Sequence, residues 1–251
     1  MILQRVEHPQ FLSNAYLVID EPGGHGVLID GNGEVEPLLE RVERERIEIT
    51  HILLTHHHGD HAMDTDRYKE RFGVPVVAHE TAAELLGNVD ETIADGDKVT
   101  SGGLEIEAIE TPGHCADHLA LMINGSDCVT ADVLFKGTVG GTRAPGATGF
   151  DDLKHSVMEK LMKLEHSIRI HPGHKQPSTI GDEWEENPFV RIWRGEDDEG
   201  TEPCKVGEED ATLVLWAPDY DGGNKAWVRF ESGEQAVVGG SQVTREGDGS
   251  G

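Results

Sequence analysis

The sequence is poor in cysteine and has no long apolar segment. Its 251 residues include 3 cysteines, which are too few and too scattered for a disulfide framework and fit a reducing cytoplasm. No apolar run reaches the roughly 18 residues of a membrane-spanning helix, and the first residues lack the apolar core of a secretion signal. The sequence therefore predicts a cytoplasmic protein that does not enter a membrane.

Positive charge is also scarce. Lys and Arg total 21 against 48 Asp and Glu, the formal net charge is -27, and only 9 of the 21 basic residues are Lys. So acidic a surface argues against nucleic acid as a partner, because nucleic-acid-binding surfaces are basic. It fits a halophilic protein, since concentrated salt screens the repulsion between carboxylates. An acidic protein from ordinary salt conditions is the alternative.

Histidine, by contrast, is concentrated in one segment. The apolar residues 52–54 predict a short buried strand, and residues 55–61 follow it with the sequence THHHGDH. Gly59 allows a sharp turn there, and a helical pattern begins after it. Imidazoles and carboxylates are ligands of zinc, iron and manganese, so this strand end is a candidate metal site; a solvated polar turn is the alternative. The candidate ligands are His56, His58, Asp60 and His61.

Three later motifs also follow apolar, strand-like runs. They are TPGH at 111–114, ADVLF at 131–135 and HPGH at 171–174. They add His114, Asp132 and His174 to the candidate ligands. The recurrence of metal-binding residue types at strand ends favours a metal site over a polar turn.

Taken together, HxHxDH, PGH, the strand-end Asp and the second PGH resemble the metallo-β-lactamase superfamily over roughly residues 1–190. The resemblance implies an α+β fold, the four-layer αββα sandwich, with two divalent metal ions at one edge, zinc first and iron or manganese as alternatives. In the family pattern one metal is held by His56, His58 and His114, the other by Asp60, His61 and His174, and Asp132 bridges both. His57 is expected to point away.

Three other residues lie close to the candidate ligands in the sequence: Cys115, His118 and His171. Cys115 follows His114, but a metal-activated hydroxide needs no cysteine nucleophile, so an ordinary structural position is preferred. His118 is expected to support the site rather than bind metal. His171 is expected to alternate away from His174 in an extended segment.

The glycine-rich residues 135–150 lack the motifs of a phosphate-binding loop. We expect a loop beside the metal site, with Lys136 and Arg143 as candidate substrate contacts.

The sequence predicts one large domain followed by a linker, a small appendage and a tail. A catalytic domain is predicted over 1–195, an acidic linker over 196–210, a small β appendage over 211–245 and a disordered tail over 246–251. The strands of the appendage are predicted at 211–217, 225–231 and 235–238. Three strands are marginal alone, so the appendage should pack on the main domain. No residue in it suggests a chemical role.

Within the superfamily, the order of the motifs resembles the glyoxalase II-like branch, which hydrolyses hydroxyacyl thioesters. The implied reaction is attack of a metal-bridged hydroxide, oriented by Asp60 and Asp132, on the carbonyl of a small-molecule thioester. The chain departs from this branch in two respects: Ala131 replaces the usual Gly, and the helical C-terminal part that supplies basic thiol-binding residues is not recognisable.

Four other functions are alternatives to a thioester hydrolase. A persulfide dioxygenase shares the framework but uses one iron. A ribonuclease-like metallohydrolase needs a large inserted domain, and only 42 residues separate Asp132 from His174. A true β-lactamase is disfavoured by Asp132 itself, which stands where di-zinc lactamases commonly place Cys. A purely structural metal site is disfavoured because such sites usually contain thiolates.

Overall fold

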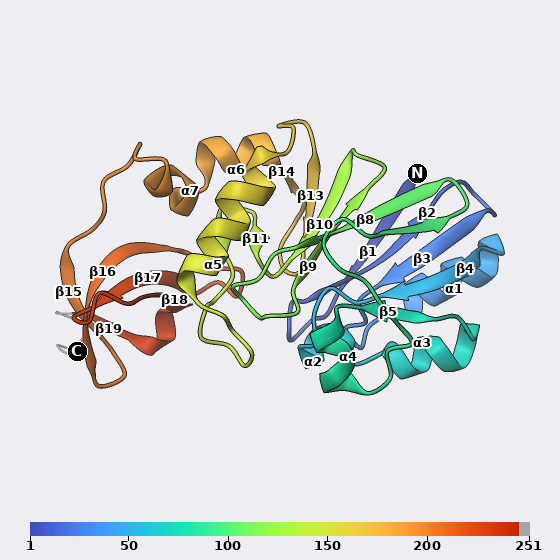
Figure 1. The fold of residues 1–251 in the computed structure, drawn as a ribbon, viewed down its shortest axis with the longest axis horizontal. Helices are drawn as coiled ribbons and strands as arrows, with labels where there is room; N and C mark the ends of the chain where they lie inside the picture. Colours follow the sequence, from blue (N-terminus) through green and yellow to red (C-terminus); the bar gives the residue numbers. More distant parts are fainter. Residues whose placement is uncertain (246–251) are drawn as a thin grey trace.

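Two six-stranded β-sheets form the centre of the molecule in the computed structural model, which describes residues 1–245 (Figure 1). The first sheet contains, in spatial order, β1 (Ile2–Glu7), β2 (Asn14–Ile19), β3 (His25–Ile29), β4 (Glu48–Leu53), β5 (Val76–Ala78) and β6 (Glu91–Thr92). The second contains β14 (Ser178–Thr179), β13 (Arg169–Pro172), β10 (Asp127–Ala131), β9 (Leu119–Ile123), β8 (Leu104–Glu110) and β7 (Lys98–Ser101). The segments β11 (Leu134–Phe135) and β12 (Thr138–Val139) form a separate hairpin.

Helices cover the outer face of each sheet. Those of the first half of the chain are α1 (Glu36–Glu45), α2 (Gly59–Ala62), α3 (Thr65–Phe72) and α4 (Glu80–Leu86). Those of the second half are α5 (Phe150–His155), its continuation η1 (Ser156–Lys160) and η2 (Leu161–Lys163), α6 (Ile180–Glu186) and α7 (Pro188–Trp193). The helical segment that begins with α5 thus changes from α to π and then to 3₁₀ geometry along its length.

Three apolar clusters hold these layers together. One lies between the two sheets and includes Tyr16 of β2 and Leu121 of β9. A second joins the first sheet to its helices, with Leu38 of α1 packed among strand residues. The third joins the second sheet to α5, α6 and α7. This arrangement is the four-layer αββα sandwich predicted from the sequence, and that prediction is confirmed.

The C-terminal part forms a five-stranded sheet, where the sequence predicted three strands. Its spatial order is β18 (Gln235–Gly239), β17 (Asn224–Phe230), β16 (Glu209–Pro218), β15 (Glu202–Val206) and β19 (Val243–Arg245), with η3 (Gly240–Gln242) between β18 and β19. Strand β15 lies inside the predicted acidic linker, 196–210. In this strand Cys204 and Val206 are buried and Lys205 between them is exposed. This alternation of buried and exposed side chains is typical of a β-strand, although the segment is acidic. The predicted disordered tail, 246–251, lies outside the described residues.

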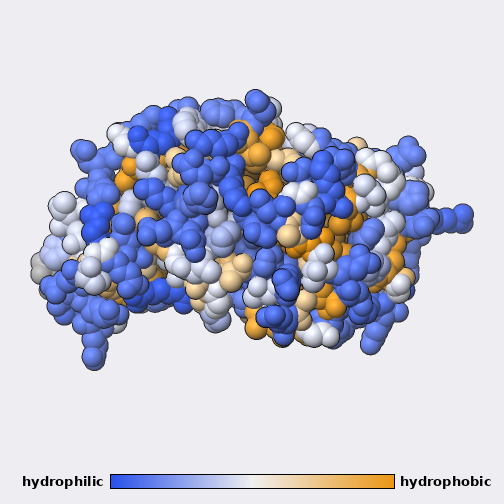
Figure 2. Space-filling view, in the orientation of Figure 1, coloured by the Kyte–Doolittle hydropathy of each residue, from blue (hydrophilic) through white to orange (hydrophobic). Residues whose placement is uncertain are grey.

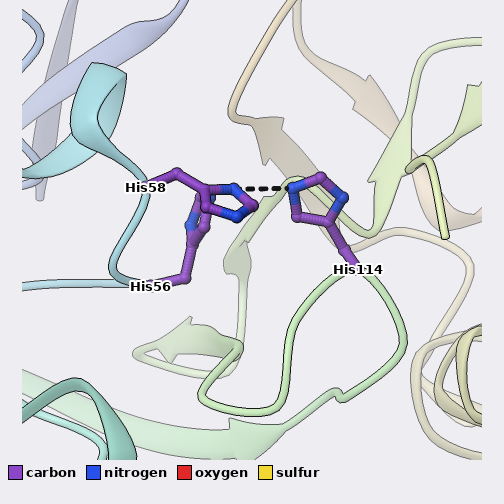
Figure 3. A group of neighbouring side chains, drawn as sticks. All are labelled: His56, His58 and His114. Atoms are coloured by element: carbon purple, nitrogen blue, oxygen red, sulfur yellow. Dashed lines mark hydrogen bonds between the residues drawn. The ribbon is translucent and has the colours of Figure 1, made fainter. Parts of the chain in front are cut away.

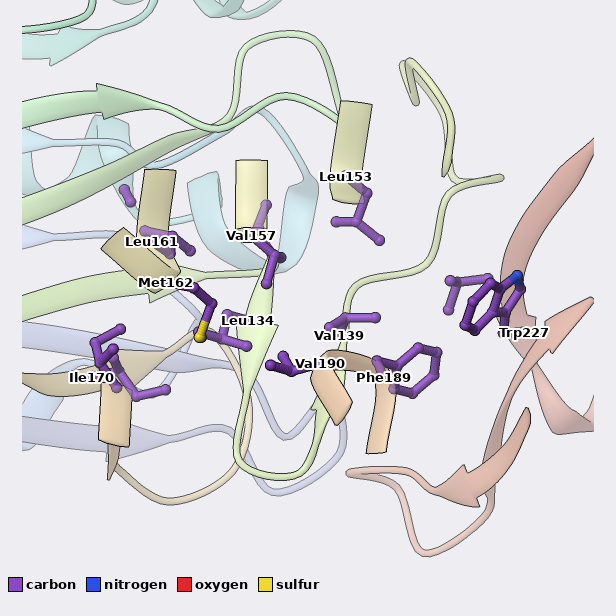
Figure 4. Packing of buried hydrophobic residues seen from close by; sticks show 14 of the residues in the cluster. Leu134, Val139, Leu153, Val157, Leu161, Met162, Ile170, Phe189, Val190 and Trp227 are labelled. Atoms are coloured by element: carbon purple, nitrogen blue, oxygen red, sulfur yellow. The ribbon is translucent and has the colours of Figure 1, made fainter. Parts of the chain in front are cut away.

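This sheet shares a core with the sandwich. Figure 4 shows Trp227 of β17 beside Phe189 of α7 and Leu153 of α5, all members of one buried cluster. The Trp227 ring stacks on Phe150 with centroids 5.0 Å apart. The predicted packing of the appendage on the main domain is therefore extensive.

One face of the molecule is mainly polar (Figure 2). The face shown in Figure 2 is covered mostly by hydrophilic residues, with apolar residues visible in patches between them. Within residues 1–245, no helix combines the length and apolar character needed to cross a membrane.

Candidate metal centre

The predicted ligands lie at the ends of strands from both central sheets. His56 follows β4 of the first sheet, while Asp132 and His174 follow β10 and β13, which are parallel neighbours in the second. His114 lies in the connection from β8 to β9. Because the carboxyl ends of these strands share one edge of the sandwich, side chains from distant segments meet there.

Three histidines form the first group of potential ligands. Ligand atoms of His56, His58 and His114 all lie within 4.8 Å of one another, and Figure 3 shows their rings converging. His114 Nε2 lies 3.0 Å from His58 Nδ1. The same His114 atom is 3.5 Å from Asp132 Oδ2, so the carboxylate adjoins this group.

Asp60, His61 and His174 form the second group, again with ligand atoms within 4.8 Å of one another. His61 Nε2 and His174 Nε2 each lie 3.7 Å from Asp60 Oδ2. His61 Nε2 is 3.4 Å from Asp132 Oδ1, and His174 Nε2 is 3.4 Å from Asp132 Oδ2. Asp132 thus lies between the two groups.

Several inward-facing atoms of the site lack the partners that buried polar atoms need. His56 Nε2, His61 Nε2 and Asp132 Oδ1 are buried, and none has a hydrogen-bond partner among the described residues. Unpaired buried polar atoms are destabilising by about 1–3 kcal/mol each. Their convergence, with imidazole and carboxylate chemistry, fits divalent metal ions.

The contact between His58 and His114 also indicates a metal site. The outer nitrogens of both rings donate hydrogen bonds: His58 Nε2 to the Pro145 carbonyl at 2.9 Å and His114 Nδ1 to the Gly141 carbonyl at 2.8 Å. In the neutral rings the two inner nitrogens therefore both carry lone pairs, 3.0 Å apart. A cation between them removes that repulsion.

The protonation states of His56, His114 and Asp132 also suit metal binding. Burial lowers the pKa of His114 to about 4 and lowers the pKa of His56 well below its usual value, so both rings are neutral. Burial alone would raise the pKa of Asp132, but His174 and His61 hold it well below its usual value. Neutral imidazoles and an ionised carboxylate are the forms that bind metals.

Asp30, which directly follows β3, supports ligands of both groups. His61 Nδ1 donates to Asp30 Oδ2 at 3.0 Å. Thr55 donates to Asp30 through its backbone N–H and its hydroxyl, both at 2.8 Å, and the hydroxyl lies 3.0 Å from His56 Nδ1. A buried Asp directly after the apolar strand β3, which pairs with β4, was the available signal.

His118 supports the site as the sequence suggested. The backbone N–H of Asp132 donates to His118 Nε2 at 3.0 Å, while His118 Nδ1 lies 2.7 Å from Thr111 Oγ1. His171 bonds to Asp127 at 2.7 Å and is not among the clustered ligands.

His57 faces a different partner from its neighbours. Its Nδ1 lies 2.7 Å from Asp117 Oδ1. His57, His58 and Cys115 also have potential ligand atoms within 4.8 Å of one another. Burial raises the pKa of the Cys115 thiol, so the thiolate that a nucleophile or metal ligand requires is disfavoured.

A cavity of about 660 Å³ has Lys136 and Lys175 among its lining residues, and none of the candidate ligands lines it. Tyr220, at the turn between β16 and β17, also lines it and stacks on His174. Arg143, by contrast, is engaged by the C-terminal sheet: it pairs with Glu209 at 3.5 Å and lies over the Phe230 ring. Of the two candidate substrate contacts, Lys136 faces this cavity and Arg143 does not line it.

Comparisons with known proteins agree with this geometry. A family model described as the metallo-beta-lactamase superfamily matches residues 8–174. Hydroxyacylglutathione hydrolase of Rhizobium meliloti is 33% identical over 160 residues, which cover 63% of this chain and 60% of that enzyme.

Two solved structures extend the likeness. ETHE1 from Myxococcus xanthus is 28% identical with a TM-score of 0.67, covering 76% of this chain and 84% of that one. TTHA1623, solved in a di-iron-bound form, is 30% identical with a TM-score of 0.63, covering 74% of this chain and 99% of that one. About a quarter of the present chain has no counterpart in these matches.

Proposed function

Since the chain belongs to the metallo-β-lactamase superfamily, we propose that it is a two-metal hydrolase of hydroxyacyl thioesters. The observation that carries the proposal is the position of Asp132 between two groups of three potential ligands. One carboxylate that reaches both groups suits two cations held close together.

The chemistry divides between the metals and the chain. Two divalent cations held by these residues would supply a hydroxide nucleophile near neutral pH and would polarise the attacked carbonyl. Asp60, whose side chain is 27% exposed, and Asp132 accept hydrogen bonds and so orient the nucleophile. The thiolate leaves without a general acid, because a thiol pKa of about 8.5 makes it an adequate leaving group.

The cavity lined by Lys136 and Tyr220 gives the rest of the substrate a place to bind. At about 660 Å³ it has the size of an ordinary small-molecule site. Its lining includes Lys136 and Lys175 as well as Glu7, Glu183 and Glu186, so polar groups of both charges can contact the thiol moiety.

A relative supports the proposed substrate class. Hydroxyacylglutathione hydrolase names the substrate class, but the alignment spans only 60% of that enzyme, so the thiol is part of the proposal. We propose zinc as the metal. The di-iron form of TTHA1623 makes iron the alternative for this chain.

The test is a set of lactoyl and acetyl thioesters of several small thiols, offered to metal-loaded protein. We expect hydrolysis of at least one hydroxyacyl thioester, and loss of that activity in His58→Ala. His57→Asn is the matched control, because an amide can still donate to Asp117 and His57 is outside the proposed ligand set. Thioester hydrolysis that survives His58→Ala would overturn the proposal.

The alternatives are distinguished in the same preparation. A persulfide dioxygenase should contain one iron per chain and consume oxygen with a persulfide, and a ribonuclease-like enzyme should cleave RNA. Either activity in metal-loaded protein that leaves every thioester intact would replace the thioesterase assignment.

A further inference from the structure

Four of the five candidate histidine ligands have their outer nitrogen held by a hydrogen bond. In each ring one nitrogen faces the other ligands and the second is bonded to a fixed group. The pairs are His56 with Thr55, His58 with Pro145, His61 with Asp30 and His114 with Gly141. Such partners fix the tautomer and the orientation of a metal-binding imidazole.

His174 is the exception. Its Nδ1 is buried and has no hydrogen-bond partner among residues 1–245. An aromatic ring lies against the imidazole instead: the Tyr220 and His174 centroids are 4.0 Å apart and the planes differ by 10°. Phe135 approaches the same imidazole at 5.8 Å and 68°. His174 is thus fixed by ring packing, where the other four are fixed by hydrogen bonds.

Tyr220 is itself held firmly at the tip of the β16–β17 hairpin. Asp219 and Lys225 form an ion pair at 2.9 Å across the base of this tip, with side chains only 6% and 8% exposed. The backbone N–H of Tyr220 donates to Asp219 Oδ1 at 2.8 Å, and that of Asp219 donates to the Gly223 carbonyl at 3.0 Å. Lys225 Nζ also lies 5.3 Å from the Tyr220 ring centroid.

We propose that Tyr220 is a positioning residue for the second metal, and that the C-terminal sheet is therefore part of the metal centre. Its ring holds the His174 imidazole with Nε2 toward Asp60 and Asp132, each of which has an oxygen within 3.7 Å. The family match ends at His174, so Tyr220 and the C-terminal sheet lie outside the part of the chain that the family model describes.

The proposal predicts different effects of losing the Tyr220 ring on the two metal positions. Without the Tyr220 ring, one side of the His174 imidazole loses its packing, and no hydrogen bond on Nδ1 replaces it. Loss of a group that orients a ligand typically weakens metal binding about 10–100-fold. The first group keeps its own supports, so its affinity should not change. The inference rests on the two-metal site proposed above, but not on the identity of the substrate.

The test is calorimetric titration of the metal-free full-length chain with Zn²⁺. For wild type we expect two equivalents, and for Tyr220→Ala one unchanged equivalent and one weakened about 10–100-fold. Tyr220→Phe keeps the ring and should restore the second equivalent. Trp216→Ala removes an aromatic residue of the same sheet outside the site and should bind both equivalents normally.

Three results would overturn the proposal: two unchanged equivalents in Tyr220→Ala, equal weakening of both equivalents in that variant, or a single equivalent in wild type. Because the readout is metal binding, a chain that passes this test but cleaves no thioester would disprove the proposed function alone. Circular dichroism of each variant shows whether the sheet has folded.

Discussion

Gly173 lies very close to two of the candidate ligands. A Cβ at this position would lie 2.0 Å from Asp132 Oδ1 and 3.0 Å from His61 Cε1. The glycine of the HPGH motif is therefore required by the neighbouring carboxylate.

Gly173→Ala should displace the Asp132 carboxylate and weaken metal binding by about 10–100-fold, the usual effect of disturbing ligand orientation. Gly59→Ala is a matched control, because a Cβ there meets nothing within 4 Å although both neighbours are candidate ligands. Metal content after dialysis measures the difference. Equal metal content in the two variants would contradict the account.

The candidate ligands could be predicted from sequence because each stands in a short motif after an apolar run. Asp30 and Tyr220 could not be. Asp30 acts because β3 lies beside β4, and Tyr220 acts because a hairpin far along the chain folds back onto His174. Neither residue lies in a local pattern that reveals its partner.

At the scale of single elements, β10 and β13 are joined by Asp127 as well as by their backbones. Its carboxylate accepts hydrogen bonds from Arg169 at 2.8 Å and from His171 at 2.7 Å. Burial alone would raise the pKa of Asp127, but these hydrogen bonds hold it below its usual value. The carboxylate therefore stabilises the fold at neutral pH and loses that effect as pH falls through the lowered pKa.

Asp127→Asn should reduce the free energy of unfolding at pH 7 by about 1.5–3 kcal/mol, the range for hydrogen bonds to charged groups. The difference from wild type should begin to shrink as the pH falls below about 4, the usual pKa of the unfolded carboxyl, and should disappear once the pH is below the lowered pKa of the folded protein. Urea unfolding at several pH values measures it. A difference that does not change with pH would show that the charge is not responsible.

The hairpin that carries Tyr220 depends on the buried Asp219–Lys225 pair. Lys225→Met leaves Asp219 buried without its partner and should destabilise the protein by about 3–5 kcal/mol. Lys205→Met is the control, since its pair with Asp210 in the same sheet is exposed and is worth at most about 1 kcal/mol. Urea midpoints compare the two, and equal losses would contradict the role assigned to burial.

At the same scale, the strands of the sandwich could be predicted from apolar runs and turn residues. The strand β15 was not, because its buried Cys204 and Val206 alternate with charged or exposed residues inside an acidic segment. Composition indicated a linker there. The segment is a strand because it pairs with β16 and β19, and its composition does not reveal that pairing.

The net charge of -27 is a property of the whole molecule. Above about 1 M salt the Debye length falls to about 3 Å, so repulsion among surface carboxylates is largely screened. We therefore expect the melting temperature to rise by several degrees from dilute buffer to molar KCl. Thermal unfolding followed by circular dichroism measures it, and a flat response would remove the halophilic interpretation.

The central claim is that both groups of ligands, joined by Asp132, act as one catalytic centre. Its most direct test is the rate of thioester hydrolysis by the metal-free full-length chain as Zn²⁺ is added stepwise. We predict little activity after the first equivalent and a steep rise that levels off at two equivalents per chain. Full activity at one equivalent, or none at two, would contradict the account.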